Sequence, residues 1–278
     1  MTESPIRLSE QLRLFREAHP PRHLDAAGAN WEYLSAGQGG RAVVLLPGGG
    51  GAGEDMFTLM AGLETDFRVI AIGCPLAMTR TQDVIDGLAA ILDHEGVAQA
   101  CLLGQSLGGA FAECFMLRYP ERTASLVLAN IAHFGKLRAA FIRGVLPLIP
   151  RLPRWLARRR MRSTFNRLLK GHPEKEFWVS FLSAEIEQVG PVGMSNRLRC
   201  LRDAMDGFPA SRADLRGWNG PVLLLESDNE TGFTKRERLA LRRLYPNAEV
   251  HVFQGAGHLS FITQPREFEA AVRRFLNR

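Results

Sequence analysis

The stretch CLLGQSLGG, residues 101–109, decides how this chain is interpreted. A short apolar run leads into a serine flanked by glycines, and a helix-like segment follows over residues 107–118. The pattern GxSxG between a strand and a helix is typical of a sharp, strained turn that exposes a nucleophilic serine, here Ser106. Gly104 and Gly108 fit this prediction because so tight a turn leaves little room for side chains at those positions. The alternative is a glycine-rich turn in which the serine is incidental.

Buried strands and helices alternate on both sides of this turn. Strands are expected at 41–46, 67–72, 100–103, 124–129, 221–225 and 248–253, and helices at 54–63, 81–94, 107–118, 235–244 and 264–276. Strands that are apolar on both faces are typical of a parallel sheet with helices on each side. A short amphipathic helix at 8–18 and a hairpin over 23–34 precede them. The predicted fold class is therefore α/β, with a mostly parallel central sheet.

The alternation stops in the second half of the chain. From about residue 131 to residue 219 the sequence is helical and interrupted by prolines, with no clear strand. We therefore predict one core, residues 1–131 and 220–278, with a helical cap inserted at residues 132–219. Such a cap would cover the site and set its specificity.

The composition is that of an ordinary globular protein. The chain has 278 residues, 46% hydrophobic and 23% charged, which is enough for a buried core and too apolar for a disordered chain. No apolar run is long enough to span a membrane, and the first 20 residues lack the apolar centre of a secretion signal. The four cysteines are far apart, so reduced thiols, a cytoplasmic location and no metal site are expected.

The net charge of +6 hides a local concentration of basic residues. Residues 133–170 contain eleven lysine and arginine side chains and no acidic one. The simplest explanation is a solvated helix face. The alternatives are an anionic membrane surface, an anionic ligand or substrate, or a protein partner. Nucleic acid is not expected, because no recognised binding module accompanies the charge. The oligomeric state is left open.

Four stretches together support a resemblance to a known family: FREAHP (15–20), LLPGGGG (45–51), GQSLGG (104–109) and RLYPNAEV (243–250). Over almost its whole length the chain resembles the α/β-hydrolase superfamily, and within it the maspardin-like group. The resemblance implies the α/β-hydrolase fold with an inserted cap. It also implies a catalytic triad in the chain order serine, acid, histidine.

The base and the acid of that triad are sought late in the chain. His258 lies in a glycine-rich loop between a strand and the last helix, which suits an imidazole that must turn into a cleft. After the strand at 221–225, the family's strand-Gly-x-x-Asp pattern places Glu230 at the acid position. Asp228, two residues earlier, is the rival candidate.

The oxyanion hole and the substrate contacts complete the predicted site. The backbone N–H of Leu107 follows the nucleophile and would be one oxyanion donor. By resemblance, Gly49 supplies the other. Candidate substrate contacts are Gly48 and Gln105 beside these donors, with His133, Phe134 and Trp178 from the cap. For the cap residues, ordinary packing is the alternative.

The loop after the strand at 41–46 also matches a dinucleotide-binding pattern, GxGxxG, at Gly48, Gly50 and Gly53. That pattern requires an acidic residue at the end of the next strand to hold a ribose. The strand at 67–72 is instead followed by Gly73, Cys74 and Pro75. We therefore expect no nucleotide cofactor.

The function predicted from the sequence is hydrolysis of an ester or thioester of a small acyl substrate. Ser106 would act as nucleophile, His258 as base and Glu230 or Asp228 as the orienting acid, with no metal or organic cofactor. The alternative keeps the fold without the hydrolysis: a lyase, a cyclase, an acyltransferase or a maspardin-like protein-binding module.

Overall fold

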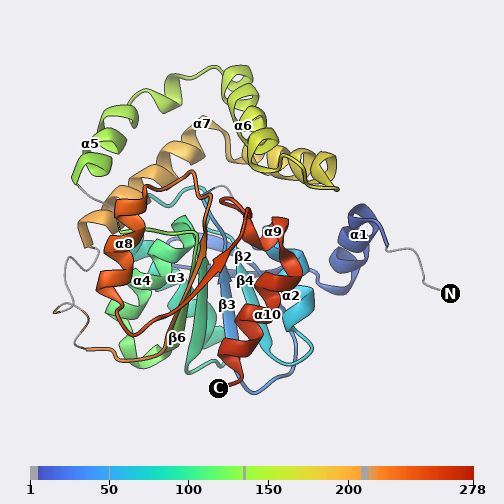
Figure 1. The fold of residues 1–278 in the computed structure, drawn as a ribbon, viewed down its shortest axis with the longest axis vertical. Coiled ribbons are helices and arrows are strands. Elements are labelled where there is room, and N and C mark those ends of the chain that lie inside the picture. The colour runs from blue at the N-terminus through green and yellow to red at the C-terminus, as the bar shows by residue number, and fades with distance from the viewer. Residues whose placement is uncertain (1–5, 50, 134–135, 208–212, 214, 216) are drawn as a thin grey trace.

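The protein folds around a single sheet of eight strands (Figure 1). The computed structural model describes residues 6–49, 51–133, 136–207, 213, 215 and 217–278. The strands, in the spatial order β1-β2-β4-β3-β5-β6-β7-β8, are β1 (Arg22–Ala26), β2 (Ala29–Ala36), β4 (Arg68–Ile72), β3 (Ala42–Leu46), β5 (Ala100–Gln105), β6 (Thr123–Ala129), β7 (Val222–Ser227) and β8 (Glu249–Phe253). The predicted α/β fold with a mostly parallel sheet is confirmed.

The first two strands form the antiparallel edge of the sheet. β1 and β2 pair as a hairpin, and β2 pairs antiparallel with β4. Ala27 and Gly28 connect the hairpin with φ angles of 49° and 78°. Positive φ at both loop residues matches the twist of two paired strands. From β4 to β8 every neighbouring pair is parallel.

Helices cover both faces of the sheet because its central strands are apolar on both sides. In β3, Val43 and Leu45 join one core cluster while Val44 and Leu46 join the other. The first cluster includes residues of α1 (Leu8–Ala18), α2 (Phe57–Leu63), α9 (Ser260–Thr263) and α10 (Pro265–Leu276). The second includes residues of α3 (Thr81–His94), α4 (Leu107–Arg118) and α8 (Lys235–Leu244). Short 3₁₀ turns lie at η1 (Gly53–Met56) and η2 (Pro120–Arg122).

A helical segment separates β6 from β7. It consists of α5 (Lys136–Val145), the 3₁₀ turn η3 (Ile149–Arg151), α6 (Arg154–Leu168) and α7 (Lys175–Gly207), here called the inserted segment. These helices lie together above the sheet in Figure 1, and α7 packs against α3 and α4. Within α7 the backbone leaves helical geometry at Gly190, which has a φ of 61° and precedes Pro191. Within the described ranges, no helix combines the length and the apolar character needed to cross a bilayer.

Candidate active site

Ser106 occupies a strained turn between β5 and α4. Its φ of 51° and ψ of −114° lie in a region that residues with a side chain rarely adopt. A Cβ at Gly104 would lie 2.4 Å from the carbonyl oxygen of Gly108, and one at Gly108 would lie 2.0 Å from that of Leu46. The steric reason for glycine on both sides of the serine is therefore visible in the structure. Ser106 also caps the start of α4, whose first N–H groups have no acceptor within the helix.

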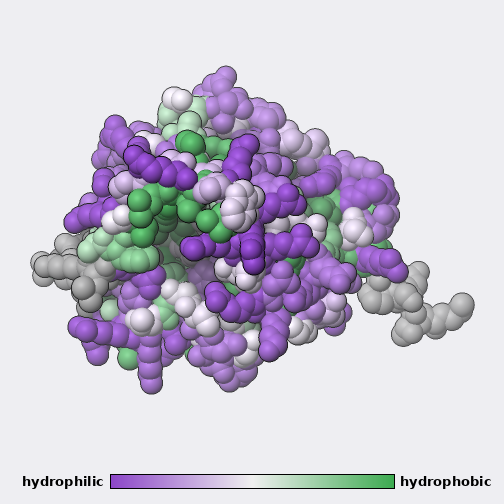
Figure 2. Space-filling view, turned by 90° about the horizontal axis from the view of Figure 1, so that it is seen from above, coloured by the Kyte–Doolittle hydropathy of each residue, from purple (hydrophilic) through white to green (hydrophobic). Residues whose placement is uncertain are grey.

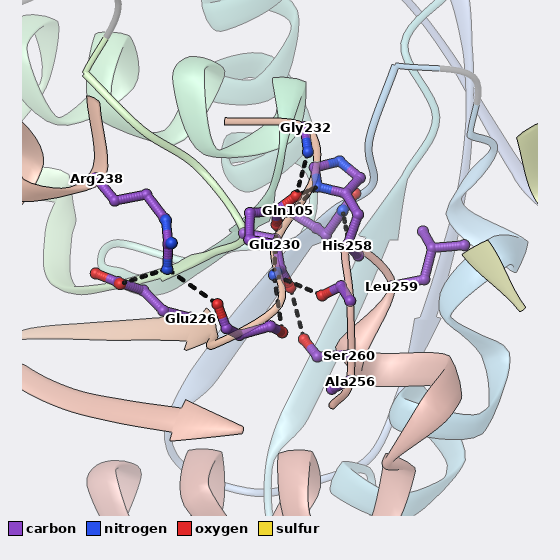
Figure 3. A network of polar contacts seen from close by, with 12 residues as sticks. Gln105, Glu226, Glu230, Gly232, Arg238, Ala256, His258, Leu259 and Ser260 are labelled. Atoms are coloured by element: carbon purple, nitrogen blue, oxygen red, sulfur yellow. Dashed lines mark hydrogen bonds and ion pairs between the residues drawn. The ribbon is translucent and has the colours of Figure 1, made fainter. Parts of the chain in front are cut away.

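His258 and Glu230 meet beside this turn. Nδ1 of His258 lies 3.0 Å from both Oε1 and Oε2 of Glu230. The side chain of Glu230 is only 1% exposed, whereas that of His258 is 17% exposed. The carboxylate is therefore shielded from water while the imidazole keeps an open side. In Figure 3 the Glu230 carboxylate points toward the His258 ring, with the backbone of Gly232 beside both.

The surroundings of Glu230 stabilise its ionised form. Burial raises the pKa of Glu230, but hydrogen bonds to the carboxylate outweigh burial and hold the pKa below its ordinary value. The donors are His258, the backbone N–H of Gly232 at 2.5 Å and the side-chain amide of Asn130 at 2.9 Å. The carboxylate thus carries its charge at neutral pH and accepts hydrogen bonds from three directions.

Asp228, the rival acid, has a different partner. Its Oδ1 accepts a hydrogen bond from the backbone N–H of Gly255 at 2.7 Å, and its side chain is exposed. Glu226, at the end of β7, forms a bidentate ion pair with Arg242 at 2.9 and 3.0 Å. The structure therefore gives the contact with the imidazole to Glu230.

Asn130 connects the end of β6 with the loop of Glu230 and with the histidine loop, and it is not among the residues predicted from the sequence. It follows β6 with a φ of 46°, which a short polar side chain tolerates. Besides Glu230, its amide donates to the backbone carbonyl of Gly257 at 3.1 Å, and its Oδ1 accepts from Ser260 Oγ at 2.6 Å. A polar residue directly after a buried strand and before the inserted segment is the sequence signal that could have identified it.

Gln105 links the serine turn to the histidine loop. Its buried amide donates to the backbone carbonyl of His258 at 3.1 Å, and its role as a substrate contact stays a prediction. Gly48 lies against the same side chain, since a Cβ there would be 2.2 Å from Gln105 Oε1 and 3.5 Å from Ser106 Cβ. Ser106 Oγ itself forms no hydrogen bond with His258 in this structure, although both residues are described.

Gly49 lies next to Leu107, the residue after the serine. A Cβ at Gly49 would be 3.7 Å from Leu107 Cδ2. The glycine loop and the start of α4 are therefore neighbours, as a two-donor oxyanion hole requires. Gly48 also accepts a hydrogen bond through its carbonyl from the N–H of Gly51 at 3.0 Å, which closes the loop into a turn. Gly50 lies outside the described residues.

No described contact joins the substrate contacts predicted from residues 132–219 to Ser106, His258 or Glu230. His133 is half-buried after β6, and burial lowers its pKa. Phe134 lies outside the described residues. Trp178 is buried in a cluster of aromatic rings with Phe57 and Phe181, at centroid distances of 5.5 and 5.9 Å. This geometry favours the packing alternative for Trp178.

Comparisons with curated proteins find hydrolases among the relatives of this chain. A hydrolase of 2-hydroxy-6-oxononadienedioate and 2-hydroxy-6-oxononatrienedioate from Burkholderia vietnamiensis (strain G4 / LMG 22486) is 26% identical over 266 residues, covering 88% of this chain and 90% of the relative. The carboxylesterase YbfK of Bacillus subtilis (strain 168) is 26% identical over 258 residues, covering 84% of this chain and 80% of the relative.

Solved structures share the fold. A hydrolase from Pseudomonas aeruginosa PA01 superimposes with a TM-score of 0.78 at 21% identity, covering 93% of this chain and 99% of that one. Residues 43–271 match the alpha/beta hydrolase family. The match spans most of the chain, from β3 into α10, and takes in the serine turn and the histidine loop. The chain belongs to the alpha/beta hydrolase family.

Proposed function

We propose that this protein is a serine hydrolase that cleaves an ester or a thioester through an acyl-enzyme. One observation carries the proposal: a buried carboxylate, Glu230, holds Nδ1 of His258 beside the strained turn of Ser106. An ionised carboxylate can only accept, so Nδ1 carries the proton and Nε2 keeps a lone pair. This tautomer can remove a proton from a serine hydroxyl.

The acylation step follows from these positions. Ser106 Oγ attacks the carbonyl carbon while its proton moves to His258 Nε2, and the imidazolium is stabilised by Glu230. The tetrahedral oxyanion accepts hydrogen bonds from the N–H groups of Gly49 and Leu107. When the intermediate collapses, the bond to the leaving alcohol or thiol breaks. His258 returns the proton to that group, which leaves an acyl-enzyme on Ser106.

Deacylation repeats the sequence with water. A water molecule gives a proton to His258 Nε2 and attacks the acyl carbon, and the carboxylic acid leaves as Ser106 regains its proton. Every proton and electron pair is supplied by the substrate, water and this chain. The steps therefore need no organic cofactor and no metal.

The relatives support hydrolysis as the reaction class. Two of them are named a hydrolase and a carboxylesterase, and each spans most of this chain at 26% identity. Within this proposal, residues 132–219 form a cap over the site, and the roles of His133 and Phe134 as substrate contacts remain predictions. The narrower resemblance to maspardin-like proteins remains a prediction.

A fluorophosphonate probe tests the activated nucleophile. We expect stoichiometric labelling of the wild-type protein and none of Ser106→Ala, together with release of p-nitrophenol from short-chain p-nitrophenyl esters. An acyl-CoA series, read with a thiol reagent, decides between ester and thioester. A folded wild-type protein without labelling and without turnover would instead favour a binding protein on this scaffold.

A further inference from the structure

A cavity of about 620 Å³ lies between the inserted segment and the loop that precedes α3. None of the candidate active-site residues lines it. Four of its eight lining residues are arginines, contributed by α5, by η3 and by the second half of α7: Thr79, Arg143, Leu146, Pro147, Pro150, Arg151, Arg199 and Arg202. We call it the arginine cavity. Two of its arginines, Arg199 and Arg202, lie outside the basic run at residues 133–170.

Few carboxylates balance this charge. Arg143 pairs with Asp206 at 3.2 Å, and Arg151 donates to the backbone carbonyl of Pro147. Among the residues that the structure describes, Arg199 and Arg202 have no carboxylate within ion-pair distance. The acidic neighbour of Arg202, Asp203, instead accepts a hydrogen bond from the N–H of Thr81 at 2.8 Å. Within the described part of the chain, three of the four guanidinium groups therefore lack a carboxylate partner.

A second observation on Arg202 concerns its hydrogen bonds. Its Nε is buried, and no described residue provides it with a hydrogen-bond acceptor. Buried polar atoms are normally paired, since a donor that leaves water without an acceptor destabilises the fold. The same arginine also lacks a carboxylate among the described residues, so a shift of the Arg202 side chain toward an anion in the cavity would break no hydrogen bond or ion pair that the described residues make.

The side chains that line the arginine cavity determine which class of ligand it can bind. Guanidinium groups bind phosphate oxygens through paired N–H donors, and a phosphate monoester offers about −1.5 to −2 charges and three acceptor oxygens. A single carboxylate would leave part of this positive charge unmatched. The cavity is also larger than one inorganic ion needs, and Leu146, Pro147 and Pro150 give it an apolar wall.

We propose that the arginine cavity binds the phosphate group of an organic phosphate, whose apolar part lies against Leu146, Pro147 and Pro150. The site is separate from the proposed hydrolysis and does not depend on it. A soluble phosphate ester and the headgroup of an anionic phospholipid share this chemistry, and the experiment distinguishes them.

The test compares two double variants with the same loss of charge. Arg199→Gln with Arg202→Gln removes the unpaired groups of the cavity. Arg159→Gln with Arg160→Gln removes two exposed arginines of α6 that do not line it. Binding of pyrophosphate and of coenzyme A is measured by calorimetry at near-physiological salt. We expect the cavity variant to bind at least about tenfold more weakly, and the α6 variant within about threefold of wild type.

Vesicles of phosphatidylglycerol identify the source of the phosphate. If coenzyme A displaces the protein from vesicles, the cavity takes lipid headgroups as well as soluble esters; if vesicles do not bind, it takes soluble esters. Equal weakening in both double variants, or no binding of either soluble probe by wild type, would overturn the proposal. Arg199→Gln alone, at an exposed position, serves if the cavity double variant does not fold.

Discussion

Nδ1 of His258 lies 3.0 Å from each carboxylate oxygen of Glu230, and the two residues come from loops 28 positions apart in the chain. The carboxylate is buried, and two further donors, Gly232 and Asn130, hold it in place. Rotation of this carboxylate away from the ring would break its hydrogen bonds from Gly232 and Asn130. The pair therefore fixes both the direction and the tautomer of the imidazole.

Glu230→Gln should lower kcat/KM for a p-nitrophenyl ester by about 10³- to 10⁴-fold, because an amide can donate to Nδ1 and so favour the wrong tautomer. The substitution keeps the size of the side chain, so the unfolding midpoint in urea should change far less than activity does. Steady-state kinetics and urea unfolding of the same preparation give both values.

Asp228→Asn is the matched control for this prediction. Its Oδ1 can still accept from the N–H of Gly255, the contact that Asp228 makes in the structure. Activity should stay within about threefold of wild type, as for surface substitutions that keep their contacts. A large loss in Asp228→Asn with little loss in Glu230→Gln would show that the acid has been misassigned by two residues.

Gly48→Ala should impair both folding and activity. The added Cβ would lie 2.2 Å from Gln105 Oε1, and the same amide donates to the carbonyl of His258 at 3.1 Å. Room can be made only by displacing Gln105, which disturbs the histidine loop. We expect a loss of about 1–3 kcal/mol in the free energy of unfolding, together with reduced ester hydrolysis.

Gly49→Ala is the neighbouring control. Its Cβ would meet no atom closer than 3.7 Å, so stability should change by less than about 0.5 kcal/mol.

Adding Gln105→Ala to Gly48→Ala removes the obstructing amide and should make the two effects non-additive. Strict additivity in this double-mutant cycle would argue against the clash.

The structural features around Ser106 that the sequence predicts are local. The strand, the turn and the helix around Ser106 follow from nine consecutive residues, and the steric demand for Gly104 and Gly108 can be stated before any coordinates are known. Apolar strands alternating with helices likewise specify a parallel sheet, because each strand must bury both faces.

The contacts that join distant segments could not be predicted in the same way. Asn130 reaches Glu230 across 100 residues and Gly257 across 127, and no local pattern encodes that meeting. The choice between Glu230 and Asp228 depended on the path of one loop. The two residues are two positions apart in the chain, but that path gives their side chains different hydrogen-bond partners. The hydrogen bond from Gln105 to the backbone carbonyl of His258 is another such contact, which spans 153 positions of the chain.

The partners of the basic run at residues 133–170 could not be predicted from the sequence either. In the sequence it is one block of charge, but the structure divides it among ion pairs such as Arg138 with Glu237 and Arg158 with Glu187, exposed helix faces and the arginine cavity. Arg199 and Arg202, which line that cavity, belong to α7 and lie about thirty residues beyond the end of the run. The pattern of charge in the sequence predicted that this surface is positive. It did not predict which basic side chains lie together in the structure.

Ser106→Gly should be more stable than Ser106→Ala. The φ of 51° is strained for alanine, as for serine, whereas glycine adopts it freely. Part of this gain is offset because glycine has more conformational freedom in the unfolded chain. We expect the free energies of unfolding of the two variants, measured in urea, to differ by about 0.5–2 kcal/mol. At the exposed helical position Ser163 the order should be reversed, since glycine destabilises a helix. If alanine gives the more stable variant at both positions, the turn stores no strain.

Glu113→Gln should stabilise the protein at high pH. Glu113 is buried on α4, where it accepts a hydrogen bond from the hydroxyl of Tyr245 at 2.7 Å. Burial raises its pKa to about 7, an effect that the hydrogen bond from Tyr245 only partly opposes. The folded protein therefore keeps a neutral carboxyl at a pH where the unfolded chain has already released the proton.

The sign of the pH dependence follows from this raised pKa. Below the ordinary glutamate pKa both states are protonated, and the contribution of Glu113 to stability is fully present. As the pH rises through about 7, that contribution is lost, by an amount on the order of 3 kcal/mol. Glutamine is neutral throughout and keeps an acceptor for Tyr245, so its advantage over wild type should grow between pH 5 and pH 8. Urea unfolding at both pH values measures it, and the exposed Glu121→Gln should show no such growth. An advantage independent of pH would mean that Glu113 is already ionised in the folded protein.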